Sequence, residues 1–415
     1  MGVKAIAFAS KLHGESYYGG VFEALRGELE RFGAEVYPEV VTSDEDAQRV
    51  ASEFADPVVI ALVLTGGVSR RIQGFALLSR VRALSLVAHG EHNSLPSAIS
   101  ARAALEEKRV GSTIFFCRSA SREECRGTVI RAVNVSRAAY RVIGARVGLV
   151  GPSSLPPESA VFQEKFGWRV ELIPLEEFDS LVEELRGLSA GEFAVKISGV
   201  EGLNDERWKL DRVAPVYLAM RRLFAERGLS AAAVDCFPYL VKHRVTPCLA
   251  IAVLNSEGLL TACEADLYSA LLMLVSRELT GSAGWIANLA CPTDRGVLFA
   301  HCTITLDMAC GAKLTTHFES GYPAAVTAQL KHSDVTLVAI DRKLSSLYVA
   351  QGRVHASGFI SSAACRTQAE VSLNLDPERL ALKAPRNHHL LMPGKVAKEL
   401  YHIAKLLNLG YVEYS

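Results

Sequence analysis

Five short polar clusters in the C-terminal half of the sequence combine carboxylate, imidazole and amide side chains. They are CEAD (263–266), AHC (300–302), THFES (316–320), CRTQ (365–368) and NHH (387–389). Each lies beside a predicted strand or at its end. Acidic and imidazole groups are costly to bury alone, and convergence on a cation removes that cost. Mixed carboxylate and imidazole ligands suit Mn²⁺, Mg²⁺ or a related divalent ion better than a thiolate zinc site does.

Neighbouring side chains within these clusters cannot all serve one ion. His388 and His389 point to opposite faces of an extended chain, so a single metal takes one of them and the other supports a ligand or faces the substrate. Cys263, Cys302 and Cys365 also lie in the clusters. A thiolate zinc site would normally bring several closely spaced cysteines, so we interpret these three as bystanders. Taken alone, each histidine would more often be an ordinary core or surface residue, so the prediction depends on the clusters meeting.

The N-terminal part of the chain alternates predicted strands and helices. Strands are expected at 3–10, 34–41, 57–67, 83–89 and 112–117, and helices at 17–32 and 121–143. The run PVVIALVLTGG (57–67) is continuously apolar, which is typical of a strand buried in a parallel sheet. Strands that alternate with helices predict right-handed βαβ crossovers.

The same pattern restarts near residue 146 and changes after residue 284. Strands are expected at 146–151, 168–174 and 193–198, and helices at 213–228, 247–255 and 266–279. Short runs rich in β-branched residues then predict antiparallel sheet or barrel, followed by a helix at 396–410 closed by Gly410 and a last strand, YVEY. The predicted fold is α/β, with two parallel-sheet (Rossmann-like) domains at 1–143 and 144–283 and a β-rich, barrel-like domain at 284–415.

Composition limits the class of protein. A chain of 415 residues is too long for one core. It has 45 basic and 45 acidic residues and no block of like charge, which argues against a nucleic-acid partner. No apolar run is long enough to cross a membrane, and no secretion signal is evident. We therefore expect a cytoplasmic protein, and its nine cysteines are expected to be reduced.

Three of the clustered residues, together with Asn288, carry a resemblance to a known family. Glu264 in CEAD, Asn288 in WIANL, His301 in FAHC and His389 in NHHLLMPG resemble, in order and rough spacing, the four metal-binding positions of the arabinose isomerase and fucose isomerase superfamily. The three predicted domains look like the build of that superfamily. In sequence the resemblance is specific from about Ala233 onward.

The resemblance implies aldose–ketose isomerisation of a small-molecule sugar through an enediol. The metal would be Mn²⁺, with Mg²⁺ or Co²⁺ as alternatives, and would polarise the sugar carbonyl. Glu264 would be both ligand and base. The family assembles as trimers or hexamers, so a homo-oligomer is implied as well. His388, His317, Arg366 and Gln368 are the residues expected to bind the substrate.

The sequence departs from the family pattern at Asn288, where the isomerases have a carboxylate. An amide oxygen can bind a hard cation but cannot accept a proton at neutral pH. Glu319 in THFES is the expected substitute as proton carrier, with Asp266 as a further catalytic candidate and Asp294 as an alternative if the alignment is shifted. Two other functions stay open, namely a metal-dependent lyase or epimerase on another sugar or sugar acid, and a sugar-binding protein without turnover.

Overall fold

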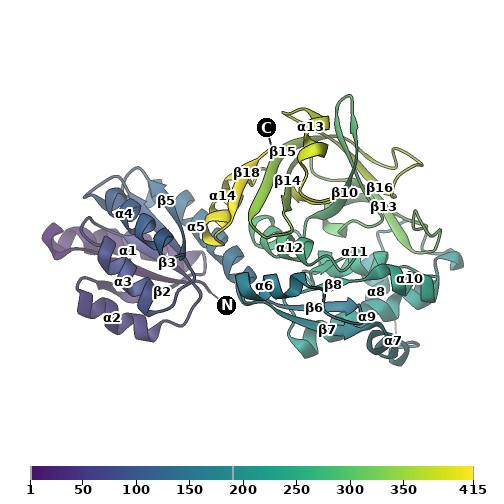
Figure 1. The fold of residues 1–415 in the computed structure, drawn as a ribbon, viewed down its shortest axis with the longest axis horizontal. Coiled ribbons are helices and arrows are strands. Elements are labelled where there is room, and N and C mark those ends of the chain that lie inside the picture. The colour runs from purple at the N-terminus through teal and green to yellow at the C-terminus, as the bar shows by residue number, and fades with distance from the viewer. Residues whose placement is uncertain (1, 189–190, 415) are drawn as a thin grey trace. The chain divides into compact units, whose positions relative to one another are not determined.

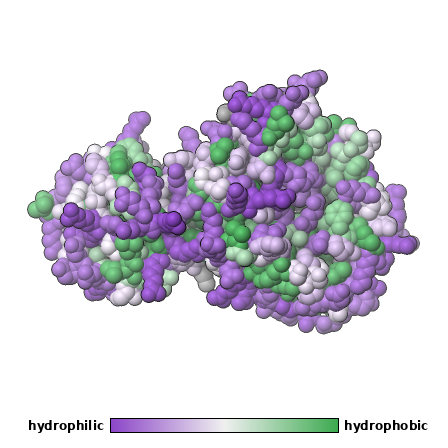
Figure 2. Space-filling view, viewed as in Figure 1, coloured by the Kyte–Doolittle hydropathy of each residue, from purple (hydrophilic) through white to green (hydrophobic). Residues whose placement is uncertain are grey.

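The structure is a computed structural model that describes residues 2–188 and 191–414. The chain forms two compact units, Met1–Ile143 with Lys398–Tyr411, and Gly144–Ala397 with Val412–Ser415. Hydrophilic residues cover most of the face seen in Figure 2, and hydrophobic residues form scattered patches between them. None of the helices in the described ranges is long and apolar enough to cross a membrane.

The first unit contains a parallel sheet in the order β2-β1-β3-β4-β5, as predicted. Its central strands β3 and β4 are buried along their whole length, which explains their continuously apolar sequences. Helix α1 packs against α5, while α3 packs against α2 and α4. The bounds are β1 Lys4–Phe8, α1 Glu15–Arg31, β2 Glu35–Val41, α2 Asp44–Glu53, β3 Val58–Val63, α3 Ser69–Leu78, β4 Ala83–His89, α4 Ser94–Glu107, β5 Gly111–Cys117 and α5 Arg122–Val142.

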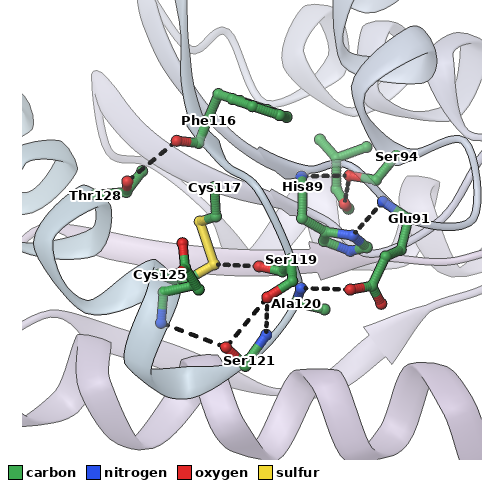
Figure 3. Close-up of a disulfide and its surroundings, with 12 residues drawn as sticks. His89, Glu91, Ser94, Phe116, Cys117, Ser119, Ala120, Ser121, Cys125 and Thr128 are labelled. Atoms are coloured by element: carbon green, nitrogen blue, oxygen red, sulfur yellow. Dashed lines mark hydrogen bonds between the residues drawn. A yellow bond between two sulfur atoms is a disulfide. The ribbon is translucent and has the colours of Figure 1, made fainter.

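A disulfide in this unit corrects the expectation that all cysteines are reduced. Cys117 ends β5 and Cys125 lies in the first turn of α5, and Figure 3 shows the bond between them. The chain folds back between the strand and the helix, which brings the two Cα atoms to 5.1 Å, within the usual range for a disulfide. Within the closed loop, Ser121 caps α5 and the Ala120 amide donates to the Glu91 carboxylate at 3.2 Å. The other seven cysteines are free thiols.

The second unit begins with another parallel sheet, in the order β7-β6-β8-β9. Its elements are β6 Arg146–Gly151, α6 Glu158–Phe166, β7 Arg169–Pro174, α7 Leu175–Glu184, α8 Gly191–Ile197, α9 Leu210–Arg227, β8 Ala231–Val234, α10 Cys236–His243, α11 Cys248–Ser256, β9 Thr261–Ala262 and α12 Leu267–Thr280. The expected strand at 193–198 is wrong, because this segment is helix α8. Phe193 and Ile197 are buried one helical turn apart, while Val195 between them is 71% exposed.

A closed six-stranded antiparallel barrel completes the second unit (Figure 1), which confirms the β-rich C-terminal fold. The order is β14-β17-β10-β11-β16-β15, and pairing of β14 with β15 closes it. Helix α12 packs against β8 and β9 of the parallel sheet and against β14 and β17 of the barrel. The bounds are β10 Trp285–Thr293, β11 Gly296–His301, β12 Ala309–Thr315, β13 Ala325–Leu330, β14 Asp334–Ile340, β15 Ser346–Gly358, β16 Thr367–Leu373, α13 Pro377–Lys383 and β17 His388–Pro393.

The parallel sheet and the barrel share one hydrophobic core. Val150 and Phe178 belong to the same buried cluster as Trp285 and Phe299 of the barrel. The predicted domain boundary at residue 283 therefore falls within a continuous core, and the three-domain division stays a prediction.

The last helix, α14 (Ala397–Leu406), ends earlier than expected. Asn408 adopts a left-handed conformation with φ of 53°, and the Leu409 amide donates to the Ala404 carbonyl at 2.7 Å. This capping arrangement around Asn408 ends the helix at Leu406, so Gly410 does not close it. Gly410 instead begins β18 (Gly410–Glu413), which confirms the predicted last strand.

Candidate metal centre

Glu264, His301 and His388 converge in the second unit. Their ligand atoms all lie within 4.8 Å of one another. The two Glu264 carboxylate oxygens are each 3.5 Å from an imidazole nitrogen, Oε1 from His301 Nε2 and Oε2 from His388 Nε2. The three residues come from a turn and two different strands, so the tertiary fold brings them together.

A tight turn after β9 presents the Glu264 carboxylate. Glu264 and Ala265 have φ values of 57° and 53°, a left-handed conformation that non-glycine residues rarely adopt. The Asp266 amide then bonds the Cys263 carbonyl at 3.1 Å, and the chain enters α12. Such strained positions persist where the surrounding structure fixes them, and they occur often at functional sites.

Strand register brings the two histidines to one end of the barrel. Asn288 of β10 lies opposite Ala300 of β11 on one side and opposite His388 of β17 on the other. The end of β11 and the start of β17 therefore flank the same point of β10. His301 is the last residue of β11, and its ring centre is 5.6 Å from that of His388.

Asp266 fixes the orientation of His388. Its Oδ2 accepts the His388 Nδ1–H at 2.8 Å, so the other ring nitrogen, Nε2, is turned toward Glu264. The same carboxylate caps α12 by accepting from the Tyr268 and Ser269 amides, and Arg386 forms an ion pair with it at 2.9 Å. A carboxylate behind an imidazole is a common support for a metal-binding histidine.

The charges of the cluster stabilise one another. Burial raises the pKa of Glu264, but the polar contacts with His301 and His388 at 3.5 Å outweigh this and hold the pKa well below its usual range. Burial lowers the pKa of His388, but Asp266 and Glu264 outweigh it and raise it to about 9. The centre thus pairs two carboxylates with the protonated imidazole of His388, and a bound divalent ion would take the place of its proton.

Unsatisfied nitrogen atoms test whether these residues fit a metal ion. Both ring nitrogens of His301 and Nε2 of His388 are buried and have no hydrogen-bond partner among the described residues. Buried polar atoms are almost always satisfied, so each exception needs an explanation. Imidazole nitrogens beside a carboxylate are donors that Mn²⁺, Zn²⁺ and related ions accept. The donor set therefore fits a divalent cation.

His389, predicted as a ligand, lies elsewhere. Its Nε2 is 3.0 Å from the Tyr414 hydroxyl, and its ring packs 5.8 Å from that of Phe299 in the core. Burial lowers the pKa of His389 to about 4. The prediction that only one of the adjacent histidines can face the ion agrees with this geometry, which favours His388 over His389.

The remaining predicted catalytic and metal positions surround the cluster in different ways. Asn288 is half-buried, and its Oδ1 accepts a hydrogen bond from the Asn387 side-chain Nδ2 at 2.8 Å. Glu319 is exposed on the loop after β12. Burial lowers the pKa of nearby His317, but Cys302 above all, and then Glu319 and Glu264, raise it above its usual value. The Asp266 carboxylate is 2% exposed and is surrounded by the donors described above, so it has no face open to a substrate.

Of the four residues predicted to bind substrate, only His388 belongs to the cluster; the other three make contacts within nearby loops. Gln368 is buried, and its amide bonds Ile360, Ser361 and Cys365, so it holds the loop before β16. His317 is buried on the loop after β12, with Ser320 on its Nδ1. Arg366 is half-buried and bonds Thr316. His388, also predicted here, belongs to the cluster itself.

Sequence reasoning missed Arg386, which bonds Asp266, and it gave no role to Asn387 of the NHH cluster, which bonds Asn288. No spacing rule singles them out. The capping role of Asp266 did have a signal, because an aspartate directly before the apolar run at 267–275 is typical of a helix N-cap.

Comparison with known proteins relates the chain to sugar isomerases at low identity. It is 24% identical over 315 residues to the sulfoquinovose isomerase of Alkalicoccus urumqiensis. The matched residues cover 70% of this chain and 69% of that protein. It is 23% identical over 301 residues to the sulfoquinovose isomerases of Priestia aryabhattai and Priestia megaterium, with 68% of this chain and 67% of each relative covered. No protein-family model matches the sequence. The relatives agree in class with the resemblance noted from the sequence.

Proposed function

We propose that this protein is a metal-dependent aldose–ketose isomerase. The observation that carries the proposal is the pair of unsatisfied imidazole nitrogens, His301 Nε2 and His388 Nε2, each 3.5 Å from the Glu264 carboxylate. The weak similarity to sulfoquinovose isomerases supports the same class of reaction.

Glu264, His301 and His388 are the proposed ligands, with His388 in place of the originally expected His389. A divalent ion bound by them would polarise the carbonyl of an open-chain sugar and lower the pKa of the adjacent C–H. We propose Mn²⁺, with Mg²⁺ or Co²⁺ as alternatives, and a trimeric or hexameric assembly. Asp266 is a positioning residue in this scheme, because it acts on the substrate only through His388.

The proton between C1 and C2 needs a carboxylate carrier. Asn288 cannot take this role, since an amide does not accept a proton at neutral pH. Glu264 is the proposed base. Glu319 is proposed as the second carrier, because it is exposed, is not in ion-pair contact with any described residue, and acts electrostatically on the same neighbour, His317, as Glu264 does. Positioned proton transfer is typically worth about 10²–10⁴-fold in rate.

Deuterium exchange tests this function. Purified protein would be loaded with Mn²⁺ and incubated in D₂O with sulfoquinovose and with neutral aldoses, and NMR would follow ketose formation and deuterium at C1 and C2. Glu264→Gln should abolish both, while Glu378→Gln, an exposed carboxylate on α13 of the same unit, should change neither.

The outcome separates the open alternatives. Deuterium incorporation without a ketose would point to an epimerase or lyase. Metal and sugar binding with no exchange in any sugar would leave a binding protein and would refute the isomerase.

A further inference from the structure

Asp235 is a carboxyl group beside the candidate metal centre that the proposed reaction does not use. It follows β8 directly, at the carboxyl end of the parallel sheet. The Ala265 amide donates to the Val234 carbonyl at 3.0 Å, so the turn that carries Glu264 is tied to the end of β8. Ligands of α/β proteins commonly bind outside the carboxyl ends of such strands. The fold therefore brings Asp235 and Glu264 to the same edge of the sheet.

The backbone of Asp235 is fixed, while its side chain leaves the following helix uncapped. Position 235 is the N-cap of α10, where an aspartate commonly accepts hydrogen bonds from the first helical amides, but this side chain makes no capping bond. The Asp235 amide donates to the Val150 carbonyl at 2.8 Å. A β-carbon at Gly151, which has a φ of 111°, would lie 2.9 Å from the Asp235 Cβ, so a glycine is required there. The fold thus holds Asp235 firmly and does not use its carboxylate to stabilise α10.

The surroundings of the Asp235 carboxylate belong to the candidate centre. Burial raises the pKa of Asp235, and the negative charge of Glu264 raises it further. The side chain is half-buried, so part of it stays accessible. Two residues on, the ring centre of Phe237 lies 5.9 Å from that of His317, which is one of the residues predicted to bind substrate. The start of α10 therefore borders the centre on the side of Glu264 and on the side of His317.

Aldose–ketose isomerisation moves two hydrogens. One passes from C2 to C1, and Glu264 and Glu319 are the proposed carriers of this proton. The other passes from the O2 hydroxyl to O1, because O2 becomes the ketose carbonyl oxygen and O1 becomes a hydroxyl. This second transfer also needs a group that accepts a proton and returns it. A carboxylate placed next to the base of the first transfer is suited to that task.

We infer that Asp235 carries the proton between O2 and O1 of the sugar. The inference rests on the proposed function, which puts C1 and C2 at Glu264. The Asp235 carboxylate takes the O2 proton, and the electron pair left on O2 forms the C2–O2 double bond while C1 receives its proton. The Asp235 carboxyl group then returns the proton to O1. Neither the sugar nor Asp235 gains or loses a proton overall.

Deuterium exchange measured beside ketose formation separates the two transfers. An aldose can lose its C2 proton and take back deuterium at C2 without any change at O2. The probes are sulfoquinovose and glucose, incubated in D₂O with the Mn²⁺-loaded protein and followed by NMR. Asp235→Asn should lower the rate of ketose formation by about 100-fold or more, the usual contribution of a placed proton carrier. Deuterium should still enter C2 of the remaining aldose at close to the wild-type rate.

Two further variants are the controls. Asp235→Glu keeps the carboxylate, so its ratio of ketose formed to aldose exchanged should stay closer to the wild-type ratio than that of Asp235→Asn. Asp211→Asn removes an exposed aspartate from the first turn of α9 and should leave both rates unchanged. Urea unfolding verifies that Asp235→Asn is folded, which is expected because the side chain caps no helix.

The outcomes distinguish this inference from the proposed function. A selective loss of ketose formation in Asp235→Asn supports Asp235 as the carrier of the oxygen-bound proton. If the wild type isomerises and Asp235→Asn loses both rates equally or neither, the inference is overturned and the isomerase stands. The same holds if Asp235→Glu shows a ratio as low as Asp235→Asn. A wild-type protein that neither exchanges nor isomerises any aldose would refute the proposed function, and the inference would fall with it.

Discussion

Replacing Asp266 by asparagine should weaken metal binding while the fold is retained. The substitution preserves size and removes the charge. Asparagine is about as good an N-cap as aspartate, so α12 should keep its capping bonds to the Tyr268 and Ser269 amides. The loss should therefore concentrate on His388 and Arg386, which the carboxylate also holds.

The expected magnitude follows from the donors around this side chain. If the amide oxygen stays on the helix amides and Arg386, its NH₂ group faces His388 Nδ1, which is now 2.8 Å from the carboxylate. Two donors cannot face each other, so the imidazole proton should move to Nε2, the atom that faces Glu264. Losing such a support typically costs 10–100-fold in metal affinity, or about 1.4–2.7 kcal/mol. Arg386 would also lose its ionic partner, which should destabilise the fold by about 3 kcal/mol.

Competition with a chromophoric chelator would give the metal Kd, and urea unfolding would give the stability. Ser269→Ala is the control, because it removes the 2.7 Å hydroxyl contact to the same Asp266 oxygen and leaves the carboxylate–imidazole bond intact. Its metal Kd should stay within about twofold of the wild type. Wild-type metal affinity in a folded Asp266→Asn protein would refute the idea that this carboxylate sets the His388 tautomer.

Three further changes probe the centre and two probe the first unit. Elemental analysis should show that His388→Gln loses the metal, whereas His389→Gln should keep it. The His389→Gln variant should unfold at a lower temperature, because a buried ring is replaced. The reverse pattern of metal loss would restore His389 as the ligand. Asn288→Asp adds a negative charge opposite His388 in the strand pairing and should tighten the metal Kd and raise isomerisation from a low base, and an unchanged Kd would separate this position from the centre. Burial lowers the pKa of His402 from 6.5 to about 4, so the unfolded chain binds more protons in that window and unfolding free energy should fall as pH drops through it; urea titrations should show a flatter profile in His402→Gln. Cys125→Ser opens the disulfide loop and should cost about 2–3 kcal/mol in unfolding free energy, with no change in unfolding as the sign that the bond is not formed in solution.

Local sequence patterns determined most of the elements. The apolar run at 57–67 predicted β3, because a strand buried on both faces is apolar along its whole length. The β-branched runs after residue 284 predicted antiparallel strands, because a strand buried on one face alternates apolar and polar residues. The segment 193–198 failed because Phe193, Val195 and Ile197 alternate as in a strand. Which of them is buried depends on what packs against the segment, and that information is not local.

The site divides in the same way. Glu264 and His301 could be named as candidate ligands from the sequence. So could the rule that only one of His388 and His389 can face a proposed ion, since adjacent residues of a strand point to opposite sides. The sequence alone does not distinguish His388 from His389, because the choice depends on which face of β17 points into the closed barrel. Likewise Asp266 could be recognised as a helix cap from its neighbours. Its bond to His388, 122 residues away, exists only because α12 packs against β17. Sequence fixes local periodicity and chemistry, whereas strand register and barrel closure decide which distant side chains meet.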